Sequence, residues 1–551
     1  MFVGGDDYGW QRVRIGRFLL PQNRKRTEAE IFDGPSRKLV VSDTVPAYAA
    51  VSARRTWSAN MTGEKPGLLD GLYDEIREIY RSDSRPWVVG YSGGKDSTTA
   101  LQLIWTAIRA LPEAERTKTI YVISSDTLVE TPVVSHYIDV TLERIAAAAA
   151  EQGMPVVTNK VMPTIDRSFW VNLIGRGYPA PSRRFRWCTE RLKIEPANEF
   201  IKSRVAEFGE VIMVLGVRSQ ESATRAQVMS LHSIEGSKLS RHSSLLNAFV
   251  YAPIANFSTD DVWTYLLQNA SPWGSDNRDL VAMYRNAQAG ECPLVVDTTT
   301  PSCGSSRFGC WVCTVVDKDK SMEAMIGSGE EWLTPLLEYR DKLADTQKPE
   351  DKIKYRDFRR RSGKVQFIGD TDRVMPGPYT MNYCRELLRE LLKTQKDVAA
   401  DAPIGEAPIL IHEAELHEIR RLWRTERGDW PDSVPRIVRE ELGRDLDWAT
   451  EDTVAFTSDD NELLDSLCAE NDVPTELVVK LLDIERASHG LKRRHAVHTR
   501  IEDAFREEWR DLDTLVAERR VAIAEGQAAD LAEDIEDGED FLAEDLTPES
   551  E

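Results

Sequence analysis

The stretch YSGGKDST, residues 91–98, has the composition of a phosphate-binding loop. Backbone N–H groups from Gly93 to Ser97, at the start of a helix, would form a nest for an anion, and Lys95 would add a positive charge. A Walker-type triphosphatase loop needs glycine at the position of Val89 and Ser or Thr at the position of Asp96. The loop therefore predicts pyrophosphate binding without the hydroxyl that serves γ-phosphate chemistry.

A second group of reactive residues is rich in cysteine. Cys303, Cys310 and Cys313 follow a C-x6-C-x2-C spacing, and Cys188 lies far upstream in RWCTE. Four thiolates from two segments can enclose a zinc ion or a [4Fe–4S] cluster, and spacing alone does not choose between them. Cys292 is an alternative ligand. An anionic [4Fe–4S] centre is favoured by the cationic residues near Cys188 in sequence, which are Arg183, Arg184, Arg186, Arg191 and Lys193.

The basic run around Cys188 has a second interpretation. It is interleaved with Phe185 and Trp187, which could stack on bases while the arginines contact phosphates. The formal charge of −22 argues against unaided, nonspecific nucleic-acid binding and leaves room for a local basic groove. A structural or nucleotide-binding role of the run is favoured.

Alternating strands and helices must position these residues. WVVGY before the glycine loop predicts a short buried strand, and TTALQLIWTAIRAL after it predicts a helix. TIYVISSDT, MPVVTNKV and VIMVLGV predict further strands, and Thr131 with Pro132 predicts a helix start. The fold class is therefore α/β, a parallel sheet with helices on both faces. Because ligands bind at the carboxyl ends of such strands, Ser92, Asp126 and Arg218 are expected on one rim.

Long helical stretches after about residue 320 predict a mainly helical C-terminal region. An acidic segment without Lys or Arg follows Arg520 and is expected to be disordered. The predicted divisions are an N-terminal extension (1–65), a nucleotide domain with the cysteines (66–320), a helical extension (321–400), a helical C-terminal domain (401–520) and the acidic tail (521–551).

Composition limits the class of protein. The chain has 551 residues, of which 41% are hydrophobic, enough for several ordinary domain cores. It contains no unbroken apolar run of membrane-spanning length, and its start lacks the order of a signal peptide. Seven cysteines, an odd number, favour ligands or reactive thiols in a reducing compartment. A cytoplasmic location without membrane contact is expected.

The loop SGGKDS resembles the PP-loop of ATP pyrophosphatases, which have an adenine nucleotide alpha hydrolase-like fold. The resemblance implies cleavage of ATP between its α and β phosphates, with Mg2+, and catalytic roles for Lys95, Asp96 and Asp126. The segments SSDTLVET, RWCTERLKIEP, GVRSQESATR and DVWTYL are similar to the sulfate-reductase branch of that superfamily. The nucleotide contacts implied are Ser92, Gly93, Gly94, Lys95, Asp96, Ser97, Thr98, Arg218, Glu221 and Arg225.

The segments RPWVVGYSGGKDST, YPAPSRRFRWCTERLKI and PSCGSSRFGCWVCTVVDKDKSMEAM together resemble the DndC-type sulfurtransferases of DNA phosphorothioation. That family replaces a non-bridging oxygen of the DNA backbone by sulfur. The resemblance implies a [4Fe–4S] cluster at Cys188, Cys303, Cys310 and Cys313. It also implies DNA, a cysteine desulfurase as sulfur donor and other Dnd-type subunits as partners.

Three alternatives stay open. An iron–sulfur tRNA thiolase uses related activation chemistry. A phosphoadenylylsulfate reductase shares the fold but would need a C-terminal Cys-Gly-Leu-His segment, and no cysteine follows Cys468. A non-catalytic scaffold would bind ATP and recruit other Dnd subunits through the helical half.

Overall fold

A computed structural model describes residues 67–525 except 222–231, 233, 235, 243–244, 288–308, 404–406, 449–457 and 489–494. The chain divides into two units, residues 1–66 and 67–551, and all described residues belong to the second. The predicted N-terminal extension lies outside the described residues. So does the predicted acidic tail beyond residue 525.

A six-stranded sheet forms the first half of the described chain. Its order is β3-β2-β1-β4-β6-β5, and every pairing is parallel except that of β5 with β6. Val89 in β1 aligns with Val122 in β2 and with Val214 in β4. The strands are β1 (Trp87–Gly90), β2 (Ile120–Ser125), β3 (Val156–Val161), β4 (Val211–Val214), β5 (Ser240–Arg241) and β6 (Ala248–Tyr251). The predicted mostly parallel α/β fold is confirmed.

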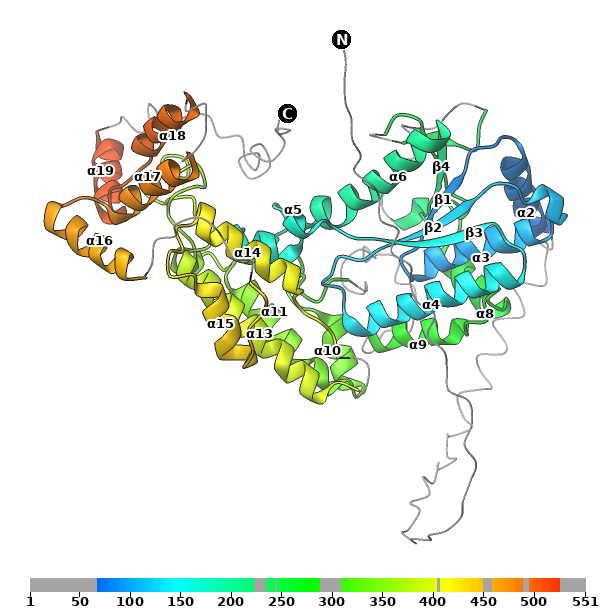
Figure 1. The fold of residues 1–551 in the computed structure, drawn as a ribbon. Helices are drawn as coiled ribbons and strands as arrows, with labels where there is room; N and C mark the ends of the chain where they lie inside the picture. Colours follow the sequence, from blue (N-terminus) through cyan, green and yellow to red (C-terminus); the bar gives the residue numbers. More distant parts are fainter. Residues whose placement is uncertain are drawn as a thin grey trace, which may run out of the picture. The chain divides into compact units, whose positions relative to one another are not determined.

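Neighbouring residues of β1 point to opposite faces of the sheet. Val89 belongs to the apolar cluster that contains Leu101 and Trp105, whereas Val88 packs with Ile201. Both valines are buried, which stabilises the fold by roughly 1.5–3 kcal/mol for each side chain. Helices α3 and α4 lie on one side of the strands and α6 lies on the other (Figure 1). The helices of this region are α2 (Gly67–Arg81), α3 (Lys95–Arg109), α4 (Pro132–Glu151), α5 (Trp187–Thr189), α6 (Glu195–Phe208), α8 (Thr259–Gln268) and α9 (Asn277–Ala287).

The second half of the described chain is mainly helical, as predicted. None of its helices, and none elsewhere in the described residues, is long and apolar enough to cross a membrane. Its helices are α10 (Lys320–Gly327), α11 (Thr334–Asp345), α12 (Lys352–Tyr355), α13 (Met381–Asp401), α14 (Glu413–Glu426), α15 (Ser433–Leu442), α16 (Ser458–Asn471), α17 (Thr475–Ser488), α18 (His495–Arg506) and α19 (Leu512–Ala524). Helix α19 therefore extends into the segment predicted to be a disordered tail.

An apolar core continues from the sheet into the helical half. Trp170 Nε1 donates to the Leu410 carbonyl at 2.6 Å, and Trp423 Nε1 donates to the Ile174 carbonyl at 2.9 Å. Gly175 ends a π-helical turn, η3 (Val171–Gly175), where a Cβ would lie 2.9 Å from Leu422 Cδ1. A side chain at this position would therefore force Leu422 of α14 to move. The boundaries proposed within 66–520 stay predictions.

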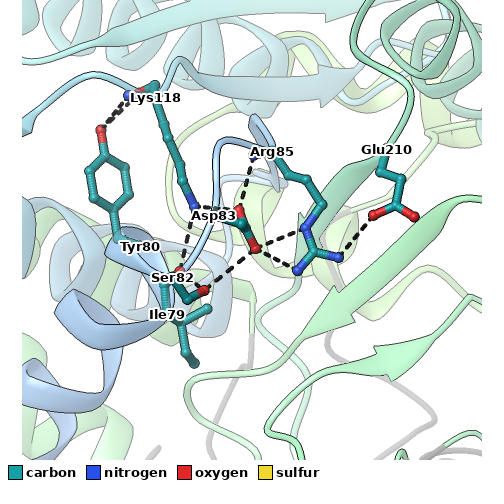
Figure 2. Close-up of polar contacts among 7 residues, drawn as sticks. All are labelled: Ile79, Tyr80, Ser82, Asp83, Arg85, Lys118 and Glu210. Atoms are coloured by element: carbon teal, nitrogen blue, oxygen red, sulfur yellow. Dashed lines mark hydrogen bonds and ion pairs between the residues drawn. The ribbon is translucent and has the colours of Figure 1, made fainter.

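The amino ends of the strands carry a half-buried polar network in which Lys118 is buried (Figure 2). Asp83 accepts from Lys118 Nζ at 2.7 Å and from Arg85 Nε at 2.8 Å. Tyr80 OH donates to the Lys118 carbonyl at 3.0 Å. Burial lowers the pKa of Lys118, and the pKa of Asp83 is lowered because hydrogen bonds from Arg85 and Lys118 outweigh its burial. We call Asp83, Arg85 and Lys118 the amino-edge triad. It ties α2 to the start of β2.

Candidate nucleotide site and thiol cluster

The glycine loop lies between the carboxyl end of β1 and the start of α3. Gly93 has φ +71°, and a Cβ there would lie 2.9 Å from Ile138 Cγ1, so the turn requires glycine. Gly94 is the N-cap of α3, and no side chain caps the helix. The Ser97 hydroxyl instead donates to the Gly94 carbonyl at 3.0 Å and accepts from the Ser92 N–H at 3.2 Å. An uncapped helix start of this kind can bind an anion.

A second triad, Lys95, Asp96 and Arg218, lies at this carboxyl edge. Lys95 Nζ lies 2.7 Å from Asp96 Oδ2, and Arg218 Nε lies 2.7 Å from Asp96 Oδ1. The Arg218 side chain is buried, and its Nη1 also donates to Thr259 Oγ1 at 3.1 Å. Asp96 therefore uses both carboxylate oxygens to orient two cations beside the loop. We call this group the carboxyl-edge triad.

Gly216 allows the loop after β4 to reach the carboxyl-edge triad. A Cβ at this position would lie 2.6 Å from the Asp96 carbonyl oxygen and 2.8 Å from the Ser97 nitrogen. Both are backbone atoms of the first turn of α3, so the contact cannot be relieved by a side-chain rotation. The position of Arg218 relative to Asp96 thus depends on the absence of a side chain two residues earlier.

Tyr284 of α9 covers one donor of the loop. The Lys95 N–H donates to Tyr284 OH at 3.3 Å, and Lys95 Nζ lies 5.6 Å from the centre of the tyrosine ring. Trp263 packs edge-on against that ring, with 5.2 Å between the two ring centroids. Sequence reasoning missed Tyr284, because nothing in the spacing of α9 connects it with a loop so far away in the chain.

Asp126 follows β2 and makes contacts of its own. Its Oδ1 accepts from the Leu128 N–H at 2.9 Å, and its Oδ2 lies 2.7 Å from Lys160 Nζ. Lys160 also pairs with Asp139 at 2.8 Å. Leu128 has φ 63°, which is rare for a residue with a side chain, and the Asp126 hydrogen bond holds that turn. Ser92, Asp126 and Arg218 thus follow three adjacent parallel strands, as predicted, while Asp126 pairs outside the carboxyl-edge triad.

A cavity of about 280 Å³ lies at the carboxyl ends of β1, β2 and β4. Val134 and Ile138 of α4 contribute apolar walls, and Ser92 of the glycine loop lines it. Glu130 and Lys193 line it as well. This volume is near the lower end of the range of about 300–1,000 Å³ that is typical of ligand pockets, which suits a nucleoside-sized group. The cavity therefore joins the predicted phosphate loop to an acid and a base.

The segment that contains Cys310 is held against the turn after β2. Glu130 and Cys310 form an antiparallel bridge, and the Trp311 N–H donates to the Val129 carbonyl at 3.0 Å. Cys310 Sγ lies 3.3 Å from Thr127 Oγ1 and 3.8 Å from Glu130 Oε1. Glu130 Oε1 also lies 3.3 Å from Lys193 Nζ. One carboxylate therefore contacts both the thiol and a lysine that lines the cavity.

The described thiols influence one another electrostatically. Burial and the Glu130 carboxylate raise the pKa of Cys310 to about 12, and burial with the nearby Cys313 raises the pKa of Cys188. The charge of the Cys310 thiolate raises the pKa of Lys193. Cys188, Cys310 and Cys313 thus lie in one neighbourhood with a lysine.

Soft thiolates beside a cation suit an anionic iron–sulfur cluster. Within the described ranges, however, no three His, Cys, Asp or Glu side chains stand close enough to hold a metal. Cys303, and its alternative Cys292, lie outside the described residues. The described thiols thus have the right chemistry, and the complete ligand set stays a prediction.

Residues 86–315 match the family of the phosphoadenosine phosphosulfate reductase domain. The matched segment contains the glycine loop, the carboxyl-edge triad and the thiols of Cys188, Cys310 and Cys313. It supports a nucleotide-using domain of the PP-loop type.

Two further comparisons name similar proteins. An uncharacterised protein of Methanocaldococcus jannaschii, MJ0066, is 25% identical over 270 residues, which are 48% of this chain and 45% of that protein. The chain therefore spans less than half of the relative's length. Two structures of Candida glabrata FMN adenylyltransferase, a mutant and a complex with FMN and an ATP analogue, overlap with 11% identity and TM-scores of 0.23. They cover 37% and 36% of this chain and 57% and 55% of their own. Such TM-scores carry no argument about fold or activity.

One alternative interpretation of the basic run around Cys188, stacking of Trp187 on a base, is wrong. Trp187 is buried, donates to the Pro179 carbonyl at 3.0 Å and stacks on Phe169, so it cannot stack on a base. Arg191 is also buried and lies over the Tyr178 ring. Arg186 and Lys193 act electrostatically on the Cys188 thiol.

Two predicted nucleotide contacts cannot be located. Glu221 ends the short turn η5 (Ser219–Glu221), and its side chain lies outside the described part. Arg225 lies outside the described residues altogether.

Proposed function

We propose that this protein is an ATP pyrophosphatase-type sulfurtransferase that activates an oxygen of a DNA backbone phosphate and exchanges it for sulfur. The observation that supports this most strongly is the cavity at the carboxyl edge of the sheet. Ser92 of the glycine loop lines it together with Lys193 and Glu130, and Glu130 contacts the Cys310 thiol. Nucleotide binding and sulfur chemistry would thus share one cavity.

The first reaction would form an adenylated DNA phosphate. The backbone N–H groups of residues 93–97 would bind the β and γ phosphates, and Lys95 would add its charge. A non-bridging oxygen of DNA attacks the α-phosphorus of ATP. The bond from the α-phosphorus to the oxygen that bridges the α and β phosphates breaks, and pyrophosphate leaves with the electron pair. Mg2+ would arrive with ATP on its phosphate oxygens, because Asp96 and Asp126 already pair with cations.

The second reaction would insert sulfur. Sulfur at the oxidation level of sulfide, drawn from the persulfide of a cysteine desulfurase with a thiol as reductant, attacks the activated DNA phosphorus. AMP leaves and carries the former DNA oxygen. Lys193 stands beside Cys310 and Glu130 and would stabilise a sulfur anion at that end of the cavity.

A [4Fe–4S] cluster would be held by Cys188, Cys310 and Cys313 together with Cys303. When bound, it would supply iron sites that exchange thiolate and sulfide ligands. DNA, the desulfurase and Dnd-type subunits are the proposed partners, in the cytoplasm.

A second candidate is a phosphoadenylylsulfate reductase, which the matched family's own description favours. Such an enzyme would release sulfite from the sulfonucleotide and would leave ATP intact. The two candidates therefore differ in substrate and in products.

The test incubates the protein with ATP, plasmid DNA, a cysteine desulfurase, cysteine and dithiothreitol. We expect AMP, pyrophosphate and phosphorothioate-linked dinucleotides after nuclease digestion and mass spectrometry. Lys95→Ala should form these products about 10²- to 10³-fold more slowly. Arg109→Ala, at the far end of α3, is the matched control and should behave as wild type. Sulfite release from the sulfonucleotide, or thionucleosides in tRNA without backbone sulfur, would contradict the proposal.

A further inference from the structure

A fixed turn presents arginines beside the thiol segment. The Ser182 N–H donates to the Phe185 carbonyl at 2.9 Å, and the Pro181 carbonyl accepts from Thr314 Oγ1 at 2.6 Å and from Gln347 Nε2 at 2.8 Å. The turn is thereby anchored to the segment after Cys313 and to the end of α11. Arg184, within the turn, is exposed.

Three cations near this turn have no acidic partner among the residues that the structure describes. Across the residues that the structure describes, the side chains of Arg184, Arg186 and Lys352 make no ion pair or hydrogen bond. Their neighbours do: Arg183 Nη2 lies 3.3 Å from Asp317, and Lys354 Nζ lies 2.6 Å from Asp351. Unpaired cations are unexpected in a chain with a formal charge of −22, where acids are abundant.

Positive charges of two arginines repel Lys352. Burial lowers the pKa of Lys352, and the positive charges of Arg356 and Arg184 lower it further. Arg356 Nε donates to the Gly377 carbonyl at 2.5 Å. Gathering like charges without an anion destabilises the free protein, and a polyanion would relieve the repulsion.

We propose that Arg184, Arg186 and Lys352 form a docking surface for the phosphodiester backbone of DNA. A guanidinium pairs with phosphate through two parallel N–H groups, and an ammonium adds a point charge. Arg186 lies two residues before Cys188 in the chain, so the surface borders the thiol neighbourhood. This proposal rests on the proposed function, because only there is DNA the substrate.

The test measures binding of a short fluorescein-labelled DNA duplex by fluorescence anisotropy over a series of salt concentrations. The variant is Arg184→Gln with Lys352→Gln, and the matched control is Arg183→Gln, an adjacent exposed arginine that has an acidic partner. We expect the double variant to bind more weakly. We also expect the negative slope of log binding constant against log salt concentration to become shallower by about 2, roughly one for each lost phosphate contact. Arg183→Gln should keep the wild-type slope.

Three outcomes would overturn the proposal. They are an unchanged slope in the double variant, no duplex binding by wild type at low salt, and displacement of the duplex by tRNA at lower concentration than by unlabelled DNA. Thermal unfolding without DNA gives a separate readout: the double variant should unfold at the same or a higher temperature, because the repulsion is removed. ATP cleavage is measured alongside. Failure of cleavage with normal DNA binding would count against the proposed function and leave the docking surface standing.

Discussion

The amino-edge triad and the carboxyl-edge triad contain the same three residue types and differ in their surroundings. In the amino-edge triad, Lys118 Nζ also lies 3.5 Å from the Ile79 carbonyl, and Arg85 reaches Glu210 at 3.2 Å. The carboxyl-edge triad borders an uncapped helix start and a loop whose Ser92 lines a cavity. Lys95 and Asp96 are no more exposed than Asp83 and Arg85, so burial does not distinguish the two triads. The comparison teaches that a Lys-Asp-Arg group can serve ligand binding where it stands beside an uncapped helix start and a cavity.

The largest expected effect is on catalysis by the carboxyl edge. Lys95→Ala should lower the rate of pyrophosphate release by about 10²- to 10³-fold, because the charge that stabilises the leaving group is lost. Its free energy of unfolding should change by only about 1 kcal/mol, since Asp96 keeps its ion pair with Arg218. Pyrophosphate release and urea unfolding measure the two quantities. A large loss of stability with normal catalysis would contradict this contrast, because the carboxyl-edge triad would then stabilise the fold in the same way as the amino-edge triad.

Breaking the amino-edge triad should give the opposite result. Asp83→Ala leaves the buried Lys118 ammonium without its carboxylate and should lower the free energy of unfolding by about 3 kcal/mol. The rate of pyrophosphate release per folded molecule should stay at the wild-type value. Urea unfolding of both variants side by side tests this, and a stable Asp83→Ala protein would show that the amino edge does not hold the fold together.

The same carboxylate predicts a pH dependence. Because the pKa of Asp83 is lower in the folded protein, its contribution to stability is present at neutral pH and is lost as the pH falls through the folded pKa. The difference in unfolding free energy between wild type and Asp83→Asn should therefore shrink below about pH 4. A difference that is constant from neutral to acidic pH would contradict the ion-pair account.

Gly216→Ala tests how the carboxyl edge is positioned. The new Cβ would meet the backbone of Asp96 and push the first turn of α3 away from Arg218, which should cost about 1–3 kcal/mol of stability. ATP affinity, measured by calorimetry, should fall by about tenfold, which corresponds to about 1.4 kcal/mol. Gly71→Ala, in α2 with no atom within 4 Å of its new Cβ, is the control and should stabilise the protein slightly. Unchanged ATP affinity in Gly216→Ala would contradict the account.

The smallest effect is expected at Tyr284. Tyr284→Phe removes the hydroxyl that occupies the Lys95 N–H, so an ATP phosphate no longer has to displace it. ATP should bind about fivefold more tightly, corresponding to about 1 kcal/mol for one hydrogen bond. Calorimetry measures whether ATP affinity rises or falls in this variant. Weaker binding would contradict the account, because it would mean that the hydroxyl contacts the nucleotide itself.

Local patterns predicted the elements of the site and missed the contacts between them. The glycine loop after a buried strand, and the start of α4 at Pro132 after Thr131, both follow from local sequence. The approach of Gly216 to α3 and of Tyr284 to Lys95 depends on tertiary packing, which no local pattern encodes.

A π-helical turn sets which of the cations after Cys188 are buried. In η4 (Glu190–Ile194) the wider turn changes which side chains share a face, so Arg191 is buried while Lys193 meets Glu130. Ordinary helical spacing does not predict that arrangement.

The central claim is that a DNA oxygen attacks the α-phosphorus of ATP at the carboxyl edge. The most direct measurement uses DNA whose non-bridging backbone oxygens carry ¹⁸O, with mass spectrometry of the AMP released during sulfur insertion. The account predicts pyrophosphate together with AMP that has gained one ¹⁸O atom. Unlabelled AMP, or ADP with inorganic phosphate, would contradict it.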